Sequence, residues 1–394
     1  MAKKKSLGTQ FYLDSGVDAN KKAVHDAIKN TDAGLFPHAF AKIHQDLWQD
    51  DWARVTHSDG VGTKLTTQYL MYKEHGNAKA FRHSAQDSAV MNLDDMACVG
   101  AVNKIVGTNA INRDPSVVGG DVIAEIINGY EEFAQMLREH GIQTFMDSGE
   151  TADVGDVTRT ISMDSSWFTR MPKKDLITFD KVKPGNVIVG LASAGQATYE
   201  TVENSGIRSN GLTAAKRLLL KKEYQEKYPE IVSPGAKVGY QGKYALEDKL
   251  PGSNLTVGEA LTCPTRTYLP LIRHLLEKYP GIINGIVHNS GGGLTKSMGY
   301  GKGLHYVKND LITVPPIFHA IADAGKMDQR EMFQSFNNGV GMEIYTDPKN
   351  AEKVLRVAQL FGVEAKVIGE IAKSKDDKNR ATVQHNGQVH EYTK

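Results

Sequence analysis

Six consecutive residues, Asp59-Gly-Val-Gly-Thr-Lys64, combine a carboxylate, two glycines, a hydroxyl and an ammonium. Two glycines let backbone N–H groups face an anion, and the charged side chains suit a metal-bound polyphosphate. Residues 53–56 before them are β-prone, which predicts that the six residues leave a strand as a loop. The spacing differs from the Walker A motif, because Lys64 is followed by Leu65. A plain turn and a phosphate-binding loop both remain open interpretations.

Acidic side chains stand at three places in the first half of the chain: Asp59, Asp94 with Asp95, and Glu150 with Asp153. Magnesium bound with a nucleotide takes one or two carboxylates and leaves its other positions to phosphates and water. On a helix, Asp87 and Asp94 would be nearly superimposed, with Asp95 turned by about 100°. These residues predict a metal site, although Asp94 and Asp95 could also simply solvate a helix.

Two glycine-containing segments precede expected helices in the second half. Ser205-Gly-Ile-Arg-Ser-Asn-Gly211 stands before a helix at 212–220, and Ser290-Gly-Gly-Gly293 stands before another. Helix N-termini can seat phosphate, but glycine before a helix is also ordinary loop chemistry. His57 and His288 could bind metal or move protons, or they could be hydrogen-bonded structural residues.

The elements that must position these residues alternate between helix and strand. In the first half, helices are predicted at 18–29, 78–99 and 121–140, with Asp18 as N-cap and Lys29 at the exposed end of the first. A strand at 142–146 follows and runs into 147–153, within which residues 148–151 could form a turn. In the second half, strands are predicted at 186–192, 282–287 and 366–371, helices at 266–279 and 351–361, and a terminal hairpin at Asn386-Gly387. The alternation indicates an α/β (α+β) fold.

Length and composition restrict the class of protein. The 394 residues suit two domains, 1–175 and 176–394, joined through 172–180, and residues 221–254 are expected to be a surface insertion dispensable for chemistry. A net charge of +1, with basic residues spread out, predicts no nucleic-acid or membrane partner. No run of ~18 apolar residues occurs. Cys98 and Cys263 are expected to be buried thiols, which favours a cytoplasmic protein.

Taken in order, the motifs resemble those of the aminoimidazole ribonucleotide (AIR) synthetase family, also called the phosphoribosylformylglycinamidine cyclo-ligases of purine biosynthesis. The matching segments are Ser15-Gly-Val-Asp18, Asp59 to Lys64, Leu93-Asp-Asp95 with Gly100-Ala101, Ser148-Gly-Glu-Thr-Ala-Asp153, Ser209-Asn-Gly211, Pro264-Thr-Arg266, His288 with Gly291-Gly-Gly293, and Glu331-Met-Phe with Phe336-Asn337 and Gly339-Val-Gly-Met342. Each is modest alone, but eight in the family's order are very improbable by chance. The resemblance implies a two-domain fold and a homodimer whose N-terminal domains share a β-barrel.

The resemblance also implies an enzyme that uses ATP and Mg²⁺ to close the imidazole ring of formylglycinamidine ribonucleotide, with ADP and phosphate as further products. The implied roles are metal binding by Asp59, Asp95 and Glu150 with help from Asp94; nucleotide or phosphate contact by Gly60, Gly62, Thr63, Lys64, Gly149 and Thr151; substrate contact by Ser209, Asn210 and Gly211; and catalytic roles for Lys29, Asp59 and Arg208.

The chain also departs from the family pattern. An insertion after Ser193-Ala-Gly195 interrupts the family's S-S-G-P-H-S-N-G loop, and Arg208 stands in place of its histidine. An arginine could bind a phosphate but could not shuttle a proton at neutral pH. Three alternatives therefore stay open: a small-molecule kinase such as thiamine-phosphate kinase, a selenophosphate synthetase, and a non-catalytic assembly partner. The second would need a reactive N-terminal cysteine, and the third would have no use for uncompensated carboxylates.

Overall fold

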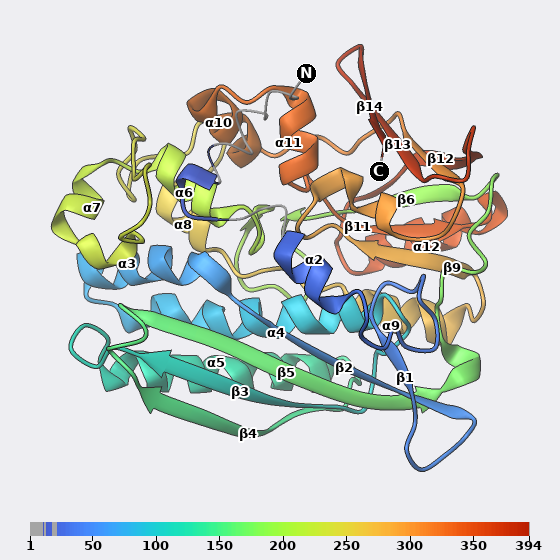
Figure 1. The fold of residues 1–394 in the computed structure, drawn as a ribbon, viewed down its shortest axis with the longest axis horizontal. Helices are drawn as coiled ribbons and strands as arrows, with labels where there is room; N and C mark the ends of the chain where they lie inside the picture. Colours follow the sequence, from blue (N-terminus) through green and yellow to red (C-terminus); the bar gives the residue numbers. More distant parts are fainter. Residues whose placement is uncertain (1–10, 12, 18–21, 394) are drawn as a thin grey trace.

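The protein consists of two β-sheets with helix α4 lying between them, as the computed structural model shows (Figure 1). The structure describes residues 11, 13–17 and 22–393. The helices are α2 (Lys22–Ile28), α3 (Leu65–His75), α4 (Arg82–Ala97), α5 (Gly120–Glu139), α6 (Leu212–Leu219), α7 (Glu223–Lys227), α8 (Val257–Thr262), α9 (Leu269–Lys278), α10 (Pro316–Gly325), α11 (Gln329–Ser335) and α12 (Ala351–Leu360). Short 3₁₀ turns are η1 (Gly62–Lys64), η2 (Ala78–Phe81), η3 (Lys173–Asp175), η4 (Pro229–Ile231), η5 (Gly293–Gly299) and η6 (Pro348–Asn350).

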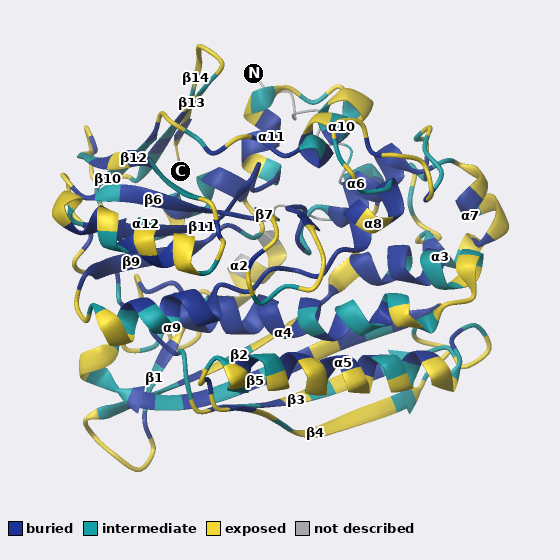
Figure 2. Cartoon of the chain, turned by 180° about the vertical axis from the view of Figure 1, so that it is seen from behind, coloured by how far each residue is buried: buried dark blue, intermediate teal, exposed yellow. Residues whose placement is uncertain are grey.

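The first sheet has the strand order β1-β2-β5-β3-β4, and only β3 and β4 run parallel. Its strands are β1 (Ile43–Gln45), β2 (Trp52–Gly60), β3 (Ile105–Arg113), β4 (Thr144–Asp153) and β5 (Ile161–Pro172). Helices α4 and α5 pack on one face (Figure 2). On the other face, hydroxyls line up across four strands, because Ser58, Ser166, Thr108 and Ser148 are successive partners in register.

The second sheet has the order β14-β13-β10-β12-β6-β11-β9. Its strands are β6 (Val187–Ala192), β9 (Ile283–His288), β10 (Leu304–Lys308), β11 (Val340–Thr346), β12 (Ala365–Lys373), β13 (Arg380–His385) and β14 (Gln388–Thr393). Strand β9 at the edge of this sheet and its neighbour β11 are buried at every residue, as expected for strands covered on both faces. A separate two-stranded ladder joins β7 (Ala194–Gly195) to β8 (Asn204–Ser205).

Helix α4 connects the two halves of the molecule, because it contacts β2 and β5 of the first sheet and α9 and β9 of the second half. Nearly all of its residues are buried, including the polar side chains Asp87, Asn92 and Asp94. A buried charge must be paired to be tolerated, so these side chains require partners from the elements around the helix.

Residues 221–254 lie at one end of the molecule and pack against α3 (Figure 1). The Tyr69 hydroxyl donates a hydrogen bond of 2.6 Å to Glu230, and Lys227 pairs with Glu74. Tyr224 and Tyr240 are buried. The segment therefore has a small apolar interior and specific contacts with the first half.

Most elements expected from the sequence are present, including the mixed α/β class, helices α5, α6, α9 and α12, and the Asn386-Gly387 hairpin. Two strands of the first sheet end later than expected. Strand β2 continues through Gly60 and β4 through Asp153, because both strands keep a paired neighbour along that length. The expected N-cap Asp18 lies outside the described residues. Within the described part, no helix is long and apolar enough to cross a membrane.

Candidate functional site

Asp59 and Gly60 form the end of strand β2. A second carboxylate, that of Asp164, lies opposite them on the neighbouring strand β5. The register pairs Gly60 with Asp164 of β5, and a side chain at Gly60 would place its Cβ 1.9 Å from Asp164 Oδ1. The Asp59 carboxylate accepts the Gly60 N–H at 2.8 Å. Burial, and then the negative charge of Asp59, raise the pKa of Asp164. The strand end thus holds two mutually repelling carboxylates, and Gly60 is needed to make room for them.

The turn after β2 touches the segment that precedes α6. Gly62 has φ 66°, and nothing lies within 4 Å of the position that a Cβ would occupy, so its backbone is open on that side. The Thr63 hydroxyl lies 2.7 Å from the Thr213 hydroxyl of α6. This contact places the segment Ser209-Asn-Gly211 next to the turn.

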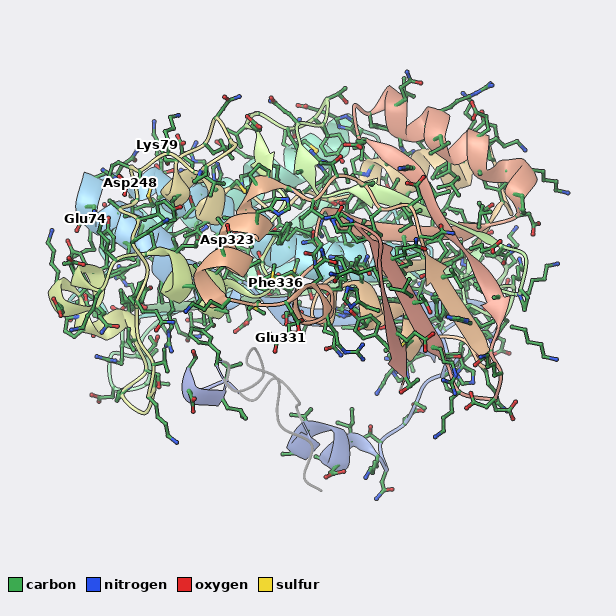
Figure 3. The ribbon with its side chains drawn as sticks, turned by 90° about the horizontal axis from the view of Figure 1, so that it is seen from above. Glu74, Lys79, Asp248, Asp323, Glu331 and Phe336 are labelled. Carbon is green, nitrogen blue, oxygen red and sulfur yellow. The ribbon has the colours of Figure 1, made fainter. Side chains whose placement is uncertain are left out.

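The segment Ser209-Asn-Gly211 also meets the glycine-rich turn after β9. A Cβ at Gly291 would lie 3.7 Å from Asn210 Oδ1, and a Cβ at Gly211 would lie 2.3 Å from the ring of Phe336 (labelled in Figure 3). Ser209 Oγ lies 2.8 Å from the Thr265 hydroxyl. The structure therefore joins three motifs that lie far apart in the sequence: the turn after Asp59, residues 209–211 and the turn at Gly291.

Lys64 corrects one expectation, because its ammonium does not face an open phosphate site. The side chain is fully buried, and Nζ lies 2.7 Å from Asp87 Oδ1 and donates to the Cys263 carbonyl. Asp87 is fixed further by the backbone N–H and hydroxyl of Thr265 at 2.8 and 2.6 Å. Lys64 thus ties α3 to α4 and to the second half.

Replacing Lys64 by methionine is expected to lower the free energy of unfolding by at least about 2 kcal/mol, since Asp87 would remain charged and buried. The apparent KM for ATP should stay unchanged in the fraction that is folded. Denaturant unfolding and initial rates check this, with the exposed Lys73→Met as the matched control. A large rise in KM without loss of stability would contradict this and show that Lys64 contacts the nucleotide phosphates.

Arg208 and Asp94 form a buried ion pair between the two halves, which corrects two further expectations. Arg208 is 1% exposed and Asp94 is fully buried, with Arg208 Nη2 lying 3.0 Å from Asp94 Oδ2. The other oxygen of Asp94 accepts the Thr267 hydroxyl and the Tyr268 N–H. Asp94 is buried among these donors and does not face an open metal site, and Arg208 positions other groups instead of contacting a substrate.

Asp95 continues this network through two histidines. Its Oδ1 lies 2.6 Å from His288 Nδ1, and its Oδ2 lies 3.3 Å from His57 Nε2. Arg208 can only donate, so its 2.6 Å contact makes His288 Nε2 an acceptor and leaves the ring proton on Nδ1. Burial would raise the pKa of Asp95, but the hydrogen bonds from His288 and His57 lower it overall.

The two histidines are expected to titrate in opposite directions. Burial, and then the Arg208 charge, lower the pKa of His288, whereas the hydrogen bond and charge of Asp95 outweigh burial and raise the pKa of His57. The stability from His57 is present below pH ~6.5 and is lost as the pH rises through its folded-state pKa. The stability linked to His288 is present above pH ~6.5 and is lost as the pH falls toward its folded-state pKa.

NMR of selectively labelled histidine rings measures these titrations one residue at a time, with His57→Gln and His288→Gln for assignment. The expected order is His57 above and His288 below the ordinary value for histidine. A His288 ring that titrates above His57 would contradict the assigned tautomer and the direction of the Arg208 hydrogen bond.

Glu150, Gly149 and Thr151 lie on the edge strand β4, away from Asp59. Asp59 pairs in register with Ser165, then Asn109, then Gly149, so three strand spacings of about 4.8 Å, roughly 14 Å, separate the two ends of the row. One ion cannot bind both Asp59 and Glu150 directly. Within the described residues, no group of three or more His, Cys, Asp or Glu side chains is arranged to hold a metal ion. The predicted four-carboxylate metal site is therefore not assembled.

Lys29 is the remaining predicted site residue, and it follows α2, which projects from the body of the molecule (Figure 3). Its ammonium lies 2.6 Å from Asp26, and both side chains are exposed. The contacts of Lys29 in the described part thus lie within its own segment, and its role near a nucleotide stays a prediction.

Two residues that contribute to the site were missed from the sequence: Asp164 and Thr213. Asp164 lies between the buried residues Met163 and Ser165 of strand β5. A charged residue within a strand-like stretch was the sequence signal that could have identified it. Thr213 gave no signal, because its contact with Thr63 depends on how the two halves pack.

Two sheets around a buried helix, with a carboxylate–glycine–threonine turn against a serine–asparagine–glycine segment, place the chain in the AIR-synthase-like class of folds. Solved structures share this fold: T. maritima PurL complexed with FGAR (TM-score 0.53, 13% identity, 91% of this chain and 47% of that chain) and complexed with ATP (0.51, 11%, 97% and 53%), and AaThiL complexed with AMPPCP and TMP (0.56, 10%, 93% and 93%). The chain spans about half the length of the PurL chains.

Sequence comparison identifies the family within this class. The model of the AIR synthase related protein N-terminal domain matches residues 31–165, and that of the C-terminal domain matches residues 183–381. The chain belongs to the AIR synthase related family. Two relatives are phosphoribosylformylglycinamidine cyclo-ligases: one from Alkaliphilus metalliredigens (28% identity, 92% of this chain, 95% of the relative) and one from Methanocaldococcus jannaschii (28%, 92% and 92%).

Proposed function

We propose that this chain is an ATP-dependent phosphoribosylformylglycinamidine cyclo-ligase, which closes the imidazole ring of formylglycinamidine ribonucleotide to give aminoimidazole ribonucleotide, ADP and phosphate. The observation that carries the proposal is the contact between Thr63 and Thr213, which brings the turn after Asp59 against residues 209–211. The shared name of relatives that match over nearly their whole length supports the same reaction.

The reaction requires a poor leaving group, the formyl amide oxygen, to become a good one. Transfer of the ATP γ-phosphoryl group to that oxygen gives an imidoyl phosphate, and attack by the amidine nitrogen on its carbon then expels phosphate and closes the ring. Phosphoryl transfer needs mainly positioning and charge neutralisation from a protein. A site that brings a phosphate-binding turn against a substrate-binding segment supplies both.

In this proposal the open backbone of Gly62, together with the neighbouring Gly60 and Thr63, contacts the nucleotide phosphates, and Ser209, Asn210 and Gly211 face the ribonucleotide. Ser209 is held by Thr265, so its hydroxyl is already oriented before a substrate binds. Gly211 brings the chain against Phe336, where a side chain would collide. Lys29, Gly149 and Thr151 remain proposed nucleotide contacts.

A magnesium ion fits the end of β2 as a partner of the nucleotide. Asp59 and Asp164 place two like charges near each other, and the described hydrogen bond of the Asp59 carboxylate is with its neighbouring N–H group. One or two carboxylates suffice when phosphates and waters complete the coordination of Mg²⁺. The bound ion would neutralise phosphate charge during transfer. Glu150 would have to act at a separate position.

We also propose a homodimer built through the open face of the first sheet, with domains at 1–175 and 176–394. Beside the row of hydroxyls on that face, Phe168, Val106 and Phe145 are successive partners in register, and Phe145 is exposed. An apolar row on an open sheet suits burial against a second copy. Light scattering should give twice the mass of one chain, and Phe145→Asp should reduce it to one.

The test of the reaction is purified protein with formylglycinamidine ribonucleotide, ATP and Mg²⁺, followed for ADP and the aminoimidazole product in equal amounts. ADP formation only with another acceptor, such as thiamine phosphate, would favour a small-molecule kinase of the same fold. No nucleotide binding at all would exclude both enzymes and leave the assembly partner. We place the protein in the cytoplasm as part of this proposal.

A further inference from the structure

Two neighbouring cations of helix α6, Lys216 and Arg217, are buried among neutral groups. Their side chains are 2% and 3% exposed. Lys216 Nζ donates to the Thr63 carbonyl at 2.9 Å and to the Thr66 hydroxyl. Arg217 Nη1 donates to the carbonyls of Ser15 and Val238 at 3.0 and 2.7 Å. Among the residues that the structure describes, neither cation has a carboxylate partner.

Three further polar groups at the same place lack partners. Arg217 Nε, the Ser15 hydroxyl and the Tyr240 hydroxyl are buried without a hydrogen bond in the described part of the protein. The Tyr240 hydroxyl lies beside Thr66 and near Arg217 without a hydrogen bond of ordinary geometry, so it belongs to the same cluster. A buried donor without an acceptor is costly, and such groups in native proteins usually mark a bound water or ion.

The charge balance of this cluster indicates which kind of group is missing. Burial, and then the charge of Arg217, lower the pKa of Lys216 to about 7, and burial lowers the pKa of Arg217. By contrast Lys308, which is equally buried, lies 2.6 Å from the Glu343 carboxylate. Buried cations are normally neutralised by an anion. Among the described residues, the cluster has two cations and unused donors but no anion.

We propose that Lys216, Arg217 and Tyr240 form an anion site that takes a phosphate group. A phosphate offers acceptor oxygens in several directions, which match the ammonium of Lys216 and the forked guanidinium of Arg217. Its negative charge would offset the free-energy cost of burying two cations. Its oxygens would accept hydrogen bonds from Arg217 Nε and Tyr240 Oη, which have no partner among the described residues. The group can come from inorganic phosphate or from a phosphate monoester of a sugar.

The position of this site adds a link to the turn after Asp59. Lys216 donates to the Thr63 carbonyl and Thr213 contacts the Thr63 hydroxyl, so α6 contacts the turn at two points. A phosphate on Lys216 would share that ammonium with the turn. Binding at this site is independent of the proposed reaction, because it requires neither ATP nor turnover.

The experiment measures the melting temperature and calorimetric binding of the full chain in inorganic phosphate and, at equal ionic strength, in chloride. Wild type should be stabilised by phosphate, and Lys216→Met should bind phosphate at least about tenfold more weakly. Tyr240→Phe, which removes one hydroxyl and keeps the ring, should weaken binding without loss of fold. Lys221→Met, which makes the same charge change just beyond the end of α6, should bind like wild type.

A second arm uses ribose 5-phosphate. Tighter binding of the monoester identifies a sugar phosphate as the occupant, and tighter binding of inorganic phosphate identifies the free ion; both support the site. Equal phosphate binding by wild type, Lys216→Met and Tyr240→Phe would overturn it, because the ion would then bind elsewhere. Absence of phosphate stabilisation in wild type would overturn it as well. Activity in the cyclo-ligase assay with no phosphate binding would leave the proposed function standing and remove only this site.

Discussion

An Asp59→Asn variant is expected to lose about 100- to 1,000-fold in turnover while it melts at the same temperature as wild type. The side chain is exposed, and its described contact is with the N–H of its own neighbour Gly60, so the core does not depend on its charge. The charge matters only when magnesium and phosphates are bound, and most of all as phosphoryl transfer proceeds. Turnover with ATP and formylglycinamidine ribonucleotide, together with a thermal melt, measures both quantities.

The matched control is Asp156→Asn, which removes another exposed carboxylate, from the loop between β4 and β5. It should keep full activity and stability. Raising the Mg²⁺ concentration should restore part of the activity of Asp59→Asn if the loss arises from weaker metal binding. Activity of Asp59→Asn close to that of wild type would remove this carboxylate from the proposed metal site.

The largest loss of stability is expected for Asp94→Ala, at about 3–5 kcal/mol of unfolding free energy. The change would leave Arg208 charged and buried, and it would also free the Thr267 hydroxyl and the Tyr268 N–H. These partners come from the second half of the chain, so the loss acts on the contact between the halves. Denaturant midpoints measured at two wavelengths provide the measurement.

A double-mutant cycle separates the ion pair from the rest of this network. Asp94→Ala combined with Arg208→Leu should be more stable than Asp94→Ala alone, because no unpaired buried charge remains. Asp94→Asn should cost less than Asp94→Ala, since it keeps an acceptor for Thr267. An Asp94→Ala protein as stable as wild type would mean that Arg208 finds another partner and that the network is not rigid.

The secondary structure was largely predictable from the sequence, because its signals are local. The apolar period of α5 and the Asn386-Gly387 turn between β13 and β14 depend on residues close together in the chain. The ends of β2 and β4 were not predictable in this way. Gly60 and Glu150 lie in strands because β5 and β3 pair with them, and glycine-rich stretches give no sign of such pairing.

The site was predictable in its parts but not in its connections. Asp59, Gly62 and residues 209–211 were chosen from the sequence, and the structure brings them into one region. Lys64 and Arg208 were misjudged because charged residues are usually exposed, and only tertiary contacts show the buried partners Asp87 and Asp94. The separation of Asp59 from Glu150 follows from strand order, which no single motif encodes.

Helix α4 determines how the two halves of the molecule unfold. Each of its three aspartates has a partner beyond residue 200, in addition to Lys64 at Asp87 and His57 at Asp95: Asp87 accepts from Thr265, Asp94 pairs with Arg208 and Thr267, and Asp95 contacts His288. A first half produced alone would hold these carboxylates without those partners, and the apolar surface of the helix would meet water. We therefore expect the two halves to depend on each other for folding. They should melt in a single cooperative transition, and neither should survive proteolysis as an independent fragment.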